Sequence, residues 1–420
     1  MKPQTTVASS PPPLTGYRVL ELGSTVAGPF CGRLFADFGA EVIKIEPADG
    51  DPVRSMGKRH NGSSLYSASI LRNKKLISID LRTEEGRAVV RRLSEKSDFL
   101  VENFRPGALE SWGLGYETLS ACNPGLIMVR ISGYGQTGPY RERPGYGAIC
   151  EAVSGLRHLT GDPDRPPSRT ATSMTDYITG LYATLGAMLA LDVRHKTGKG
   201  QIIDAALYES AFSFMEPHVP AYEKLHEIAM RAGARLPGNA PNNLYPTLDK
   251  KYIHITAASD AVFRRVASAI GRPELALDPT YATAVERAMN EETLDAIITA
   301  WTIEKNCNDI EIILHAEKVP AARIYTIEDI FNDPHYEARG MLQRVPSEEF
   351  GNVTIPAVVP RLSSNPGEIR HAGRRIGQDT RAVLREIAGM TDDEISKLEE
   401  KRVISCDSRA NNFTTSTLSS

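Results

Sequence analysis

Asp176 is the residue of this chain whose chemistry most needs an explanation. It is the only carboxylate in the segment 169–180, among small, aliphatic and hydroxyl residues. A buried unpaired charge is unfavourable unless a hydrogen-bonded partner or a reaction uses it. Ser173 and Asp176 match a capping box that opens a helix over 177–191. Alternatively, Asp176 is a covalent nucleophile held where the helix dipole favours an anion. On this segment alone the cap is favoured, because caps are common and nucleophiles are rare.

A second motif follows a predicted strand. Residues 133–138 read Gly-Tyr-Gly-Gln-Thr-Gly and match the G-x-G-x-x-G pattern of dinucleotide-binding sites. In such sites the motif opens a helix whose N-terminus receives the pyrophosphate, whereas here Pro139 follows at once. We therefore predict a hydrogen-bonding turn at this position and no NAD site.

Two regions could bind a phosphorylated ligand. The turn 23–29 follows the first predicted strand, and Glu46 ends the second at about the distance expected for a ribose-binding acid. The turn lacks the three-glycine spacing, so a phosphate cradle and a simple tight turn both stay open. Basic residues gather at 54–60 and at 72–75. Together they would suit a polyphosphate, whereas singly they are ordinary solvated charges.

Composition and spacing exclude several classes of function. The 420 residues contain 49 Lys+Arg and 52 Asp+Glu, a net charge of -3, which leaves no global basic field for nucleic acid. No apolar run reaches the length of a membrane span and the first residues lack an apolar signal core, so we expect no membrane partner and a cytoplasmic protein.

The five cysteines and nine histidines lack metal-ligand spacing, so we predict reduced cysteines and no metal. No serine or cysteine nucleophile motif stands out, which favours a carboxylate nucleophile.

The first half of the chain alternates β-branched runs with amphipathic segments, as βαβ units do. Helices are expected at 29–38 and 83–96, and the pattern predicts a doubly wound α/β domain. The expected strands are 17–22, 41–46, 76–80, 98–102, 126–132 and 201–207, with 252–256 in a second region.

Composition shifts suggest the domain limits. A disordered N-terminus (1–15) precedes the first part of a large domain (16–225), and a smaller domain follows over 226–332. Residues 333–406, with strand-like residues at 353–359 and a helix at 380–387, return to the large domain. The Ser/Thr/Asn-rich tail 407–420 is expected to be disordered.

In their order, these motifs resemble those of the family III CoA-transferases, the group that includes formyl-CoA transferase and carnitine CoA-transferase. The set is specific because so many matches occur in one order, although each alone is weak. The matching segments are 26–29, 39–46, 72–75, 101–107, 132–139, 175–180, 196–201, 319–323, 333–335 and 377–380, within a span from Val19 to about Ile404.

The resemblance implies that Asp176 is the catalytic carboxylate, a role compatible with the cap. It implies a Rossmann-like large domain made from both chain ends, a smaller α/β domain and an interlinked homodimer. The ligands would be CoA thioesters, bound as substrates and not as a permanent cofactor. The implied CoA-binding residues are Val26, Ala27, Arg54, Lys75, Asn103 and Phe104, with Tyr146 lining the thioester.

The implied chemistry suits an aspartate, which is ionised at neutral pH and can attack a thioester without a general base. Attack would give a mixed anhydride and then a β-aspartyl-CoA thioester. An anhydride must be kept from water and its oxyanions stabilised by backbone N–H groups. The candidate loop for this is 237–243, with Gly238 and Asn239 as its substrate residues.

Three departures from the resembling enzymes refine the interpretation. Val26 stands where formyl-CoA transferase has glutamine, and no run of consecutive glycines corresponds to that enzyme's glycine loop, so an oxalate/formate specificity is not expected. Pro47 stands where that enzyme has arginine, so the phosphate contact would pass to Arg54. Tyr146 stands near the position of a histidine in α-methylacyl-CoA racemases, which favours transfer over racemisation.

We therefore predict an acyl-CoA:carboxylate CoA-transferase that uses succinyl-CoA or a similar donor and a small dicarboxylic or hydroxy acid as acceptor. Arg169 and Arg235 are candidates for holding the substrate carboxylate. The alternatives are a racemase, or a CoA-binding protein in which Asp176 only caps a helix.

Overall fold

The computed structural model describes residues 10–407, and these divide into two compact units. The large unit contains 10–154, 170–216 and 337–407. The small unit contains 155–169 and 217–336. The sequence did not indicate that 155–169 belongs with the small unit. The amide of Gly233 donates to the carbonyl of Gly161 at 3.1 Å, a contact between segments too far apart in the chain for local patterning to reveal.

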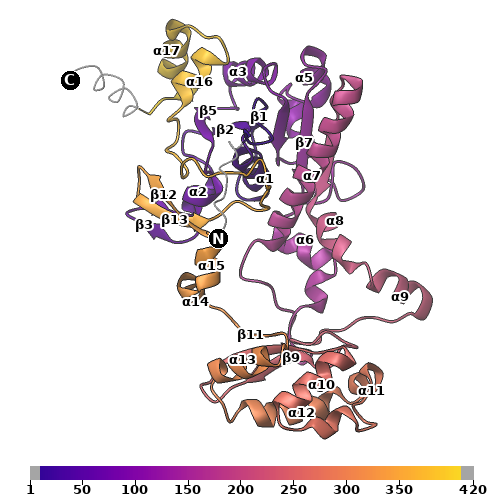
Figure 1. Ribbon diagram of the computed structural model, residues 1–420. Helices are drawn as coiled ribbons and strands as arrows, with labels where there is room; N and C mark the ends of the chain where they lie inside the picture. The colour runs from indigo at the N-terminus through magenta and orange to yellow at the C-terminus, as the bar shows by residue number, and fades with distance from the viewer. Residues whose placement is uncertain (1–9, 408–420) are drawn as a thin grey trace, which may run out of the picture. The chain divides into compact units, whose positions relative to one another are not determined.

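The large unit is built on a seven-stranded sheet of order β14-β5-β2-β1-β6-β7-β8, in which β14 alone is antiparallel (Figure 1). The chain builds outward from β1 first to one side and then to the other, so the strand order reverses between β1 and β6. Ligands of open parallel sheets bind outside the carboxyl ends of strands at such a reversal. The strands are β1 (Arg18–Glu21), β2 (Glu41–Glu46), β5 (Lys75–Ile79), β6 (Phe99–Glu102), β7 (Ile127–Ser132), β8 (Ile202–Ala206) and β14 (Ile404–Ser405).

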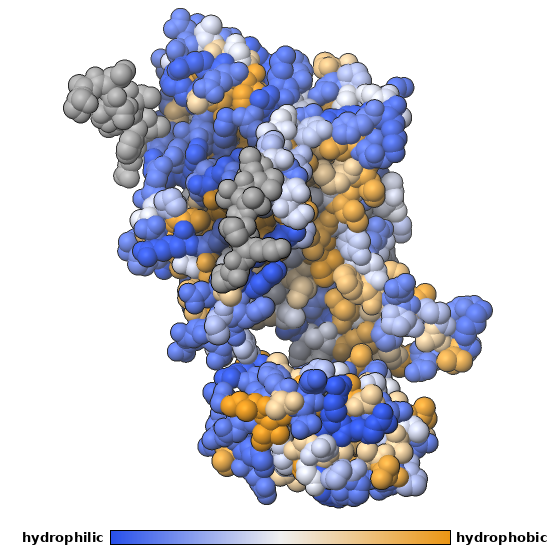
Figure 2. All heavy atoms as spheres, in the orientation of Figure 1, coloured by the Kyte–Doolittle hydropathy of each residue, from blue (hydrophilic) through white to orange (hydrophobic). Residues whose placement is uncertain are grey.

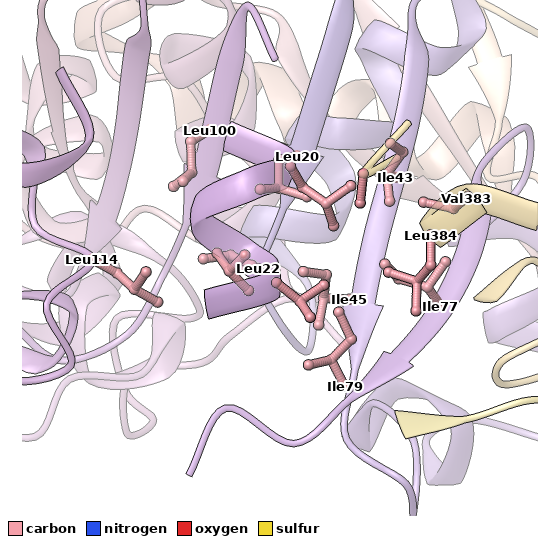
Figure 3. Packing of buried hydrophobic residues seen from close by; sticks show 14 of the residues in the cluster. Leu20, Leu22, Ile43, Ile45, Ile77, Ile79, Leu100, Leu114, Val383 and Leu384 are labelled. Atoms are coloured by element: carbon pink, nitrogen blue, oxygen red, sulfur yellow. The ribbon is translucent and has the colours of Figure 1, made fainter. Parts of the chain in front are cut away.

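The strands bury both faces because successive side chains point to opposite sides. Leu20, Ile43 and Ile77 face one core, which Figure 3 shows packed against Val383 and Leu384. Val19 and Val42 face the other core. The first core is covered by α3 (Glu84–Ser94), α5 (Tyr116–Cys122), α16 (Thr380–Glu386) and α17 (Asp392–Glu400), and the second by α1 (Ala27–Asp37) and α7 (Met174–Thr197).

Helix α7 is the longest helix of the large unit and carries Asp176 in its first turn. It packs on α1 through small residues. A β-carbon on Gly180 would stand 2.6 Å from the ring of Phe30, so glycine allows the two helices to approach. Gly198, at φ 73°, ends the helix in the left-handed conformation that glycine adopts readily.

The remaining elements of the large unit are short. They are η1 (Pro52–Ser55), β3 (Arg59–His60), β4 (Ser63–Ser64), α2 (Leu65–Ile70), α4 (Ala108–Ser111), α6 (Gly147–Val153), α8 (Leu207–Phe212), η3 (Ser213–Met215), β12 (Leu342–Ser347) and β13 (Gly351–Pro356).

The small unit packs helices on a three-stranded antiparallel sheet of order β11-β10-β9. Helix α15 (Pro334–Ala338) spans the boundary to the large unit. The other elements are η2 (Leu156–Leu159), α9 (His218–Leu225), β9 (Asn242–Pro246), β10 (Tyr252–Thr256), α10 (Asp260–Ala269), η4 (Pro273–Ala276), α11 (Ala284–Met289), α12 (Glu291–Thr302), α13 (Cys307–Ala316), β11 (Ala321–Arg323) and α14 (Ile327–Asn332).

The prediction of a mixed α/β fold with a largely parallel sheet is confirmed. Two details of the predicted termini are wrong. Residues 10–15 are ordered, because Leu14 is buried and its amide donates to the carbonyl of Phe38 at 2.9 Å. Asp407 is held by an ion pair with Arg375 at 2.5 Å. The rest of both predicted disordered ends, 1–9 and 408–420, lies outside the described residues.

Candidate active site

A cavity of about 200 Å³ opens at the carboxyl ends of β1, β6, β7 and β8, all within the large unit. It combines one carboxylate, three guanidinium groups, several polar turn residues and an exposed tyrosine. Its lining residues are Ser24, Thr25, Ala27, Asn103, Phe104, Arg105, Pro106, Ile131, Ser132, Gly133, Arg141, Arg143, Pro144, Gly145, Tyr146, Asp176 and Leu207.

Asp176 lies half-buried in this cavity, against the first residue of α6. A β-carbon added to Gly147 would stand 3.1 Å from the carboxylate carbon and well inside contact distance of Oδ2. The carboxylate therefore packs on the bare backbone of Gly147. Burial raises the pKa of the Cys150 thiol, which lies on the same helix as Gly147, to about 11, and the charge of Asp176 adds to that rise.

The predicted capping box does not form as proposed. Throughout α7, which is described along its whole length, the side chain of Ser173 accepts no capping hydrogen bond. Ser173 has φ -77° and ψ 56°, outside the extended conformation that an N-cap serine usually takes. The sequence matched the residue types of a capping box but not the backbone geometry it requires.

The turn after β1, which lines the cavity with Ser24, Thr25 and Ala27, is held by Asn103. The side chain of Asn103 accepts from the amide of Ser24 at 2.7 Å and donates to its carbonyl at 2.9 Å. Thr25 takes a positive φ of 69°, and its amide donates to Asp51 at 3.0 Å. The segments that follow β1 and β6 are thus held together by hydrogen bonds within the protein itself.

Buried charged side chains also hold the turn after β1 in place. Lys44 Nζ lies 2.8 Å from Asp51 and 3.3 Å from Glu21, and it donates to the carbonyl of Gly23. Lys74 Nζ donates to Glu21 at 2.7 Å and to the carbonyl of Pro29 at 2.7 Å. These side chains are almost fully excluded from solvent, so each depends on the others for compensation.

A second cavity of about 660 Å³ lies beside the first. It is formed at the carboxyl ends of β1, β2 and β5 by residues such as Leu22, Ile45 and Ile79, with Trp112 on one wall. Ser24 and Phe104 line both cavities, so the two share a wall at the point where the strand order reverses.

The structure brings together five of the residues expected from the sequence: Ala27, Asn103, Phe104, Tyr146 and Asp176. Tyr146, at the N-cap of α6, is 75% exposed.

The other expected residues are not part of this cavity lining. Val26 is buried at the start of α1. Arg54 forms a two-bond ion pair with Glu46, at 2.7 and 3.0 Å. Lys75 pairs with Glu41 at 2.6 Å, at the amino ends of β5 and β2 and so at the opposite edge of the sheet. Gly238 and Asn239 belong to a turn of the small unit.

The expected basic patch at 72–75 does not form. Arg72 is buried and pairs with Asp37 at 2.6 Å, while Lys74 is buried in the ionic cluster described above. These cations are structural, because their partners come from distant strands and helices. Of the two candidate carboxylate clamps, Arg235 pairs with Asp295 at 2.8 Å, and Arg169 belongs to the small unit.

Sequence reasoning missed the three arginines of the first cavity. Arg105 directly follows the matched pair Asn103 and Phe104, and Arg141 and Arg143 directly follow the glycine-rich turn. Charged residues in loops that follow parallel strands could have been singled out, because such loops carry the binding sites of α/β proteins.

Other site types find no support within residues 10–407. Those residues contain no group of three or more His, Cys, Asp or Glu arranged to hold a metal ion, and no helix of them is long and apolar enough to cross a membrane. All five cysteines are described and are free thiols.

Comparisons with known proteins find similarity over most of the chain. The family model described as CoA-transferase family III matches residues 14–380. The succinyl-CoA–D-citramalate CoA-transferase of Chloroflexus aurantiacus is 47% identical over 396 residues, covering 94% of this chain and 98% of the relative. The beta subunit of succinyl-CoA–L-malate CoA-transferase from the same organism is 43% identical, covering 93% of this chain and 98% of the relative. A crystal structure of a CaiB/BaiF family protein from Brucella suis aligns with a TM-score of 0.81 at 35% identity, covering 90% of this chain and 100% of that one.

Proposed function

The chain belongs to CoA-transferase family III and is a CoA-transferase, and on that premise we propose that Asp176 carries CoA from a dicarboxylic acyl-CoA such as succinyl-CoA to a small dicarboxylic acid. The observation that supports this most is the position of the Asp176 carboxylate: in a cavity at the carboxyl edge of the sheet, against a glycine that leaves it accessible. The relatives named for citramalate and malate support the dicarboxylic acceptor.

The proposed reaction begins when a carboxylate oxygen of Asp176 attacks the thioester carbonyl. The carbon–sulfur bond breaks, and the products are an aspartyl-acyl anhydride and CoA thiolate. The thiolate then attacks the aspartyl carbonyl, which releases the donor acid and leaves a β-aspartyl-CoA thioester. The acceptor carboxylate attacks that thioester, which breaks the carbon–sulfur bond and gives CoA thiolate and a second anhydride, between Asp176 and the acceptor. The thiolate finally attacks the acceptor's acyl carbonyl in this anhydride. This last step gives the new acyl-CoA and restores Asp176.

This route needs no general base, because each attacking group is already an anion. It does need the anhydride to be kept from water. Gly238 and Asn239, which belong to the small unit, stay our proposed source of amide donors for the oxyanions.

For CoA itself, we place the adenosine in the larger cavity at the carboxyl ends of β1, β2 and β5. Our interpretation of the domain as Rossmann-like is supported by the strand order there, and ligands of such domains lie outside these strand ends. The pantetheine arm would pass between Ser24 and Phe104, the residues common to both cavities, and bring the thioester to Asp176. Val26, Arg54 and Lys75 lie outside both linings, so any role of theirs in CoA binding stays a prediction.

Transfer is favoured over racemisation by the lining itself. A racemase needs a second acid or base beside the carboxylate, and near the position where racemases carry a histidine this cavity has Tyr146. No histidine occurs among the cavity residues, all of which are described.

We also propose a homodimer, and the surface of α7 supports it. Leu181, Leu185 and Leu189 recur at intervals of four residues and therefore share one face of the helix. Their side chains are 54%, 54% and 62% exposed, and Figure 2 shows hydrophobic residues gathered over this part of the large unit. A face of this kind on a helix is typical of a protein interface.

The covalent route is tested by incubating the protein with succinyl-CoA and trapping with hydroxylamine or borohydride. Mass spectrometry should then show modification of the peptide that contains Asp176. Asp176→Asn should lose both the adduct and transfer activity by a factor of roughly 10³ or more. Asp192→Asn is the matched control, because Asp192 lies on the same helix and is exposed beside Lys196. Turnover without any adduct at Asp176, or an active Asp176→Asn variant, would exclude the covalent mechanism.

A further inference from the structure

The cavity around Asp176 has more cationic than anionic side chains in its lining. Arg105, Arg141 and Arg143 line it together with the single carboxylate of Asp176. Arg141 lies 3.0 Å from its exposed neighbour Glu142. Within residues 10–407, Arg105 and Arg143 have no carboxylate within ion-pair distance. Most other guanidinium groups near the sheet are paired, as Arg54, Arg72 and Arg130 are. Because a thioester is uncharged, this excess suits a second, anionic group on the ligand.

Arg143 is the arginine that the local structure holds most firmly. Its guanidinium carbon lies 3.5 Å from the centroid of the Tyr140 ring, a close cation–π stack. The amide of Arg143 donates to the carbonyl of Tyr140 at 2.8 Å, which closes the turn that sets the stack. Tyr140 in turn meets the buried ring of Tyr134 edge to face, with centroids 5.9 Å apart at 81°. The flexible arginine side chain is thus ordered before a ligand binds.

Stacking leaves the binding edge of the guanidinium available. A separation of 3.5 Å between the guanidinium carbon and the ring centroid leaves room only for face-on contact with Tyr140, so the N–H donors of Arg143 project outward in the plane of the group. A planar fork of donors matches the two oxygens of a carboxylate and binds them with two parallel hydrogen bonds. Lysine could offer only a point charge here and could not stack in the same way.

We propose that Arg143, ordered by Tyr140, binds the distal carboxylate of the acyl group, which is the one not joined to CoA. This contact would select dicarboxylic over monocarboxylic acyl-CoAs. The inference rests on the function proposed above and adds the residue that recognises the distal carboxylate of the substrate. The diphosphate of CoA is a less suitable partner, because the whole pantetheine arm separates it from the thioester, while Arg143 shares a cavity with Asp176.

The test compares two donors of equal chain length. Succinyl-CoA and butyryl-CoA differ only in that a methyl group replaces the distal carboxylate. In the double-displacement scheme, kcat/KM for the donor covers only the steps up to release of the donor acid, so the acceptor does not affect it. Arg143→Gln should lower kcat/KM for succinyl-CoA roughly 100-fold and leave butyryl-CoA within about threefold. Arg143→Lys should recover only part of the loss, because it restores charge but not the fork.

Tyr140 supplies an independent check that does not remove the binding group. Tyr140→Leu should reduce the preference for succinyl-CoA about tenfold by releasing Arg143, whereas Tyr140→Phe keeps the ring and should behave as wild type. Arg385→Gln is the matched control, an exposed arginine on α16 that is remote from the cavity lining.

The outcomes separate the two proposals. An equal loss with both donors, or no loss with either, in folded Arg143→Gln and Tyr140→Leu variants would overturn the role of Arg143 and leave the transferase mechanism intact. Wild-type protein that transfers CoA from no donor would overturn the proposed function, and this inference with it.

Discussion

The carboxylate of Asp176 packs on the backbone of Gly147, where any β-carbon would stand 3.1 Å from the carboxylate carbon and closer still to Oδ2. Gly147 has an ordinary helical position as the first residue of α6, so its conformation does not require glycine. Glycine is required at this position because a side chain would occupy the space of the Asp176 carboxylate. The two residues are 29 positions apart in the chain, and only the fold makes one a condition for the other.

Gly147→Ala should therefore damage activity more than stability. The added methyl group must displace the Asp176 carboxylate, and a shift of about 1 Å in a reacting group can reduce turnover about 100-fold. We expect kcat to fall at least tenfold while the thermal unfolding midpoint changes little. Gly125→Ala is the control, because a β-carbon there would meet nothing nearer than 3.6 Å. Normal turnover by Gly147→Ala would show that the carboxylate tolerates another position.

Asn103 supports the turn after β1, so its substitution should affect acyl-CoA binding. Asn103→Asp keeps an acceptor for the amide of Ser24 but sets a carboxylate oxygen against the carbonyl of Ser24, which now receives a hydrogen bond. We expect a loss of about 1–3 kcal/mol of unfolding free energy and a clear rise in KM for acyl-CoA. Urea titration and steady-state kinetics measure the two effects.

The comparison variant for Asn103 is Asn123→Asp. The side chain of Asn123 also donates to backbone carbonyls, those of Ser94 and Ser97, but it lies outside the cavity lining. It should lose stability without a change in KM. If both variants lower stability and neither raises KM, the turn does not help to bind acyl-CoA.

The sequence predicted the framework of the fold better than the surroundings of the site. Strands β2 and β10 have the predicted bounds, because their apolar periodicity is local information. The glycine-rich segment 133–138 forms bends and opens no helix, as the following proline indicated. Asp176, Asn103 and Phe104 were expected to take part in one site, and the structure places all three in one cavity.

What the sequence could not reveal depends on pairing between distant residues. Arg72 and Lys74 read as a basic patch, and only the fold shows that Asp37 and Glu21 neutralise them in the interior. Conversely, nothing in the sequence distinguishes Arg143 from a solvated arginine, and only the structure shows its contact with the ring of Tyr140. Burial and partners, which decide whether a charge is structural or functional, are properties of the tertiary structure.

The buried pair of Lys44 and Asp51 should make stability depend on pH at both limits. Burial alone would raise the pKa of Asp51, but the charge of Lys44 and hydrogen bonds from Lys44, Val53 and Thr25 outweigh it, so the pKa is lowered from 3.8. The stabilisation from Asp51 is then present above that unfolded value and is lost as pH falls through the folded pKa. For Lys44, burial would lower the pKa, but Glu21 and Asp51 raise it above 10.5, so its contribution is present below that value and lost at higher pH.

Asp51→Asn tests the acidic limit. It should lower the unfolding free energy near neutral pH by about 3 kcal/mol, because Lys44 loses a buried partner. It should also flatten the fall in stability below about pH 4. Urea unfolding across this range measures both. Asp80→Asn, which breaks a pair with the exposed Arg82, should change the curve far less. Similar curves for wild type and Asp51→Asn would contradict the role assigned to the pair.

Thiol labelling should distinguish Cys122 from the other cysteines. Burial raises the pKa of Cys31 to about 12 and those of Cys150 and Cys406 to about 11, and it raises the pKa of Cys307 as well. Cys122 is the exposed one. Because the thiolate is the reactive form, iodoacetamide near pH 8 should modify Cys122 first in the folded protein. Peptide mass spectrometry reads the order of labelling, and rapid modification of Cys31 or Cys150 would contradict the burial described here.

The apolar face of α7 gives the last prediction, which concerns the proposed homodimer. Leu185→Lys sets a charge at the centre of the row formed with Leu181 and Leu189, and a desolvated unpaired charge is strongly unfavourable in an interface. Wild-type protein should sediment at twice the chain mass of 46.0 kDa, and Leu185→Lys should shift it toward the single-chain mass. Leu277→Lys is the control, because Leu277 is equally apolar and 82% exposed but lies in the small unit. A wild-type monomer at micromolar concentration, or a dimer unaffected by Leu185→Lys, would show that α7 is not the contact between copies.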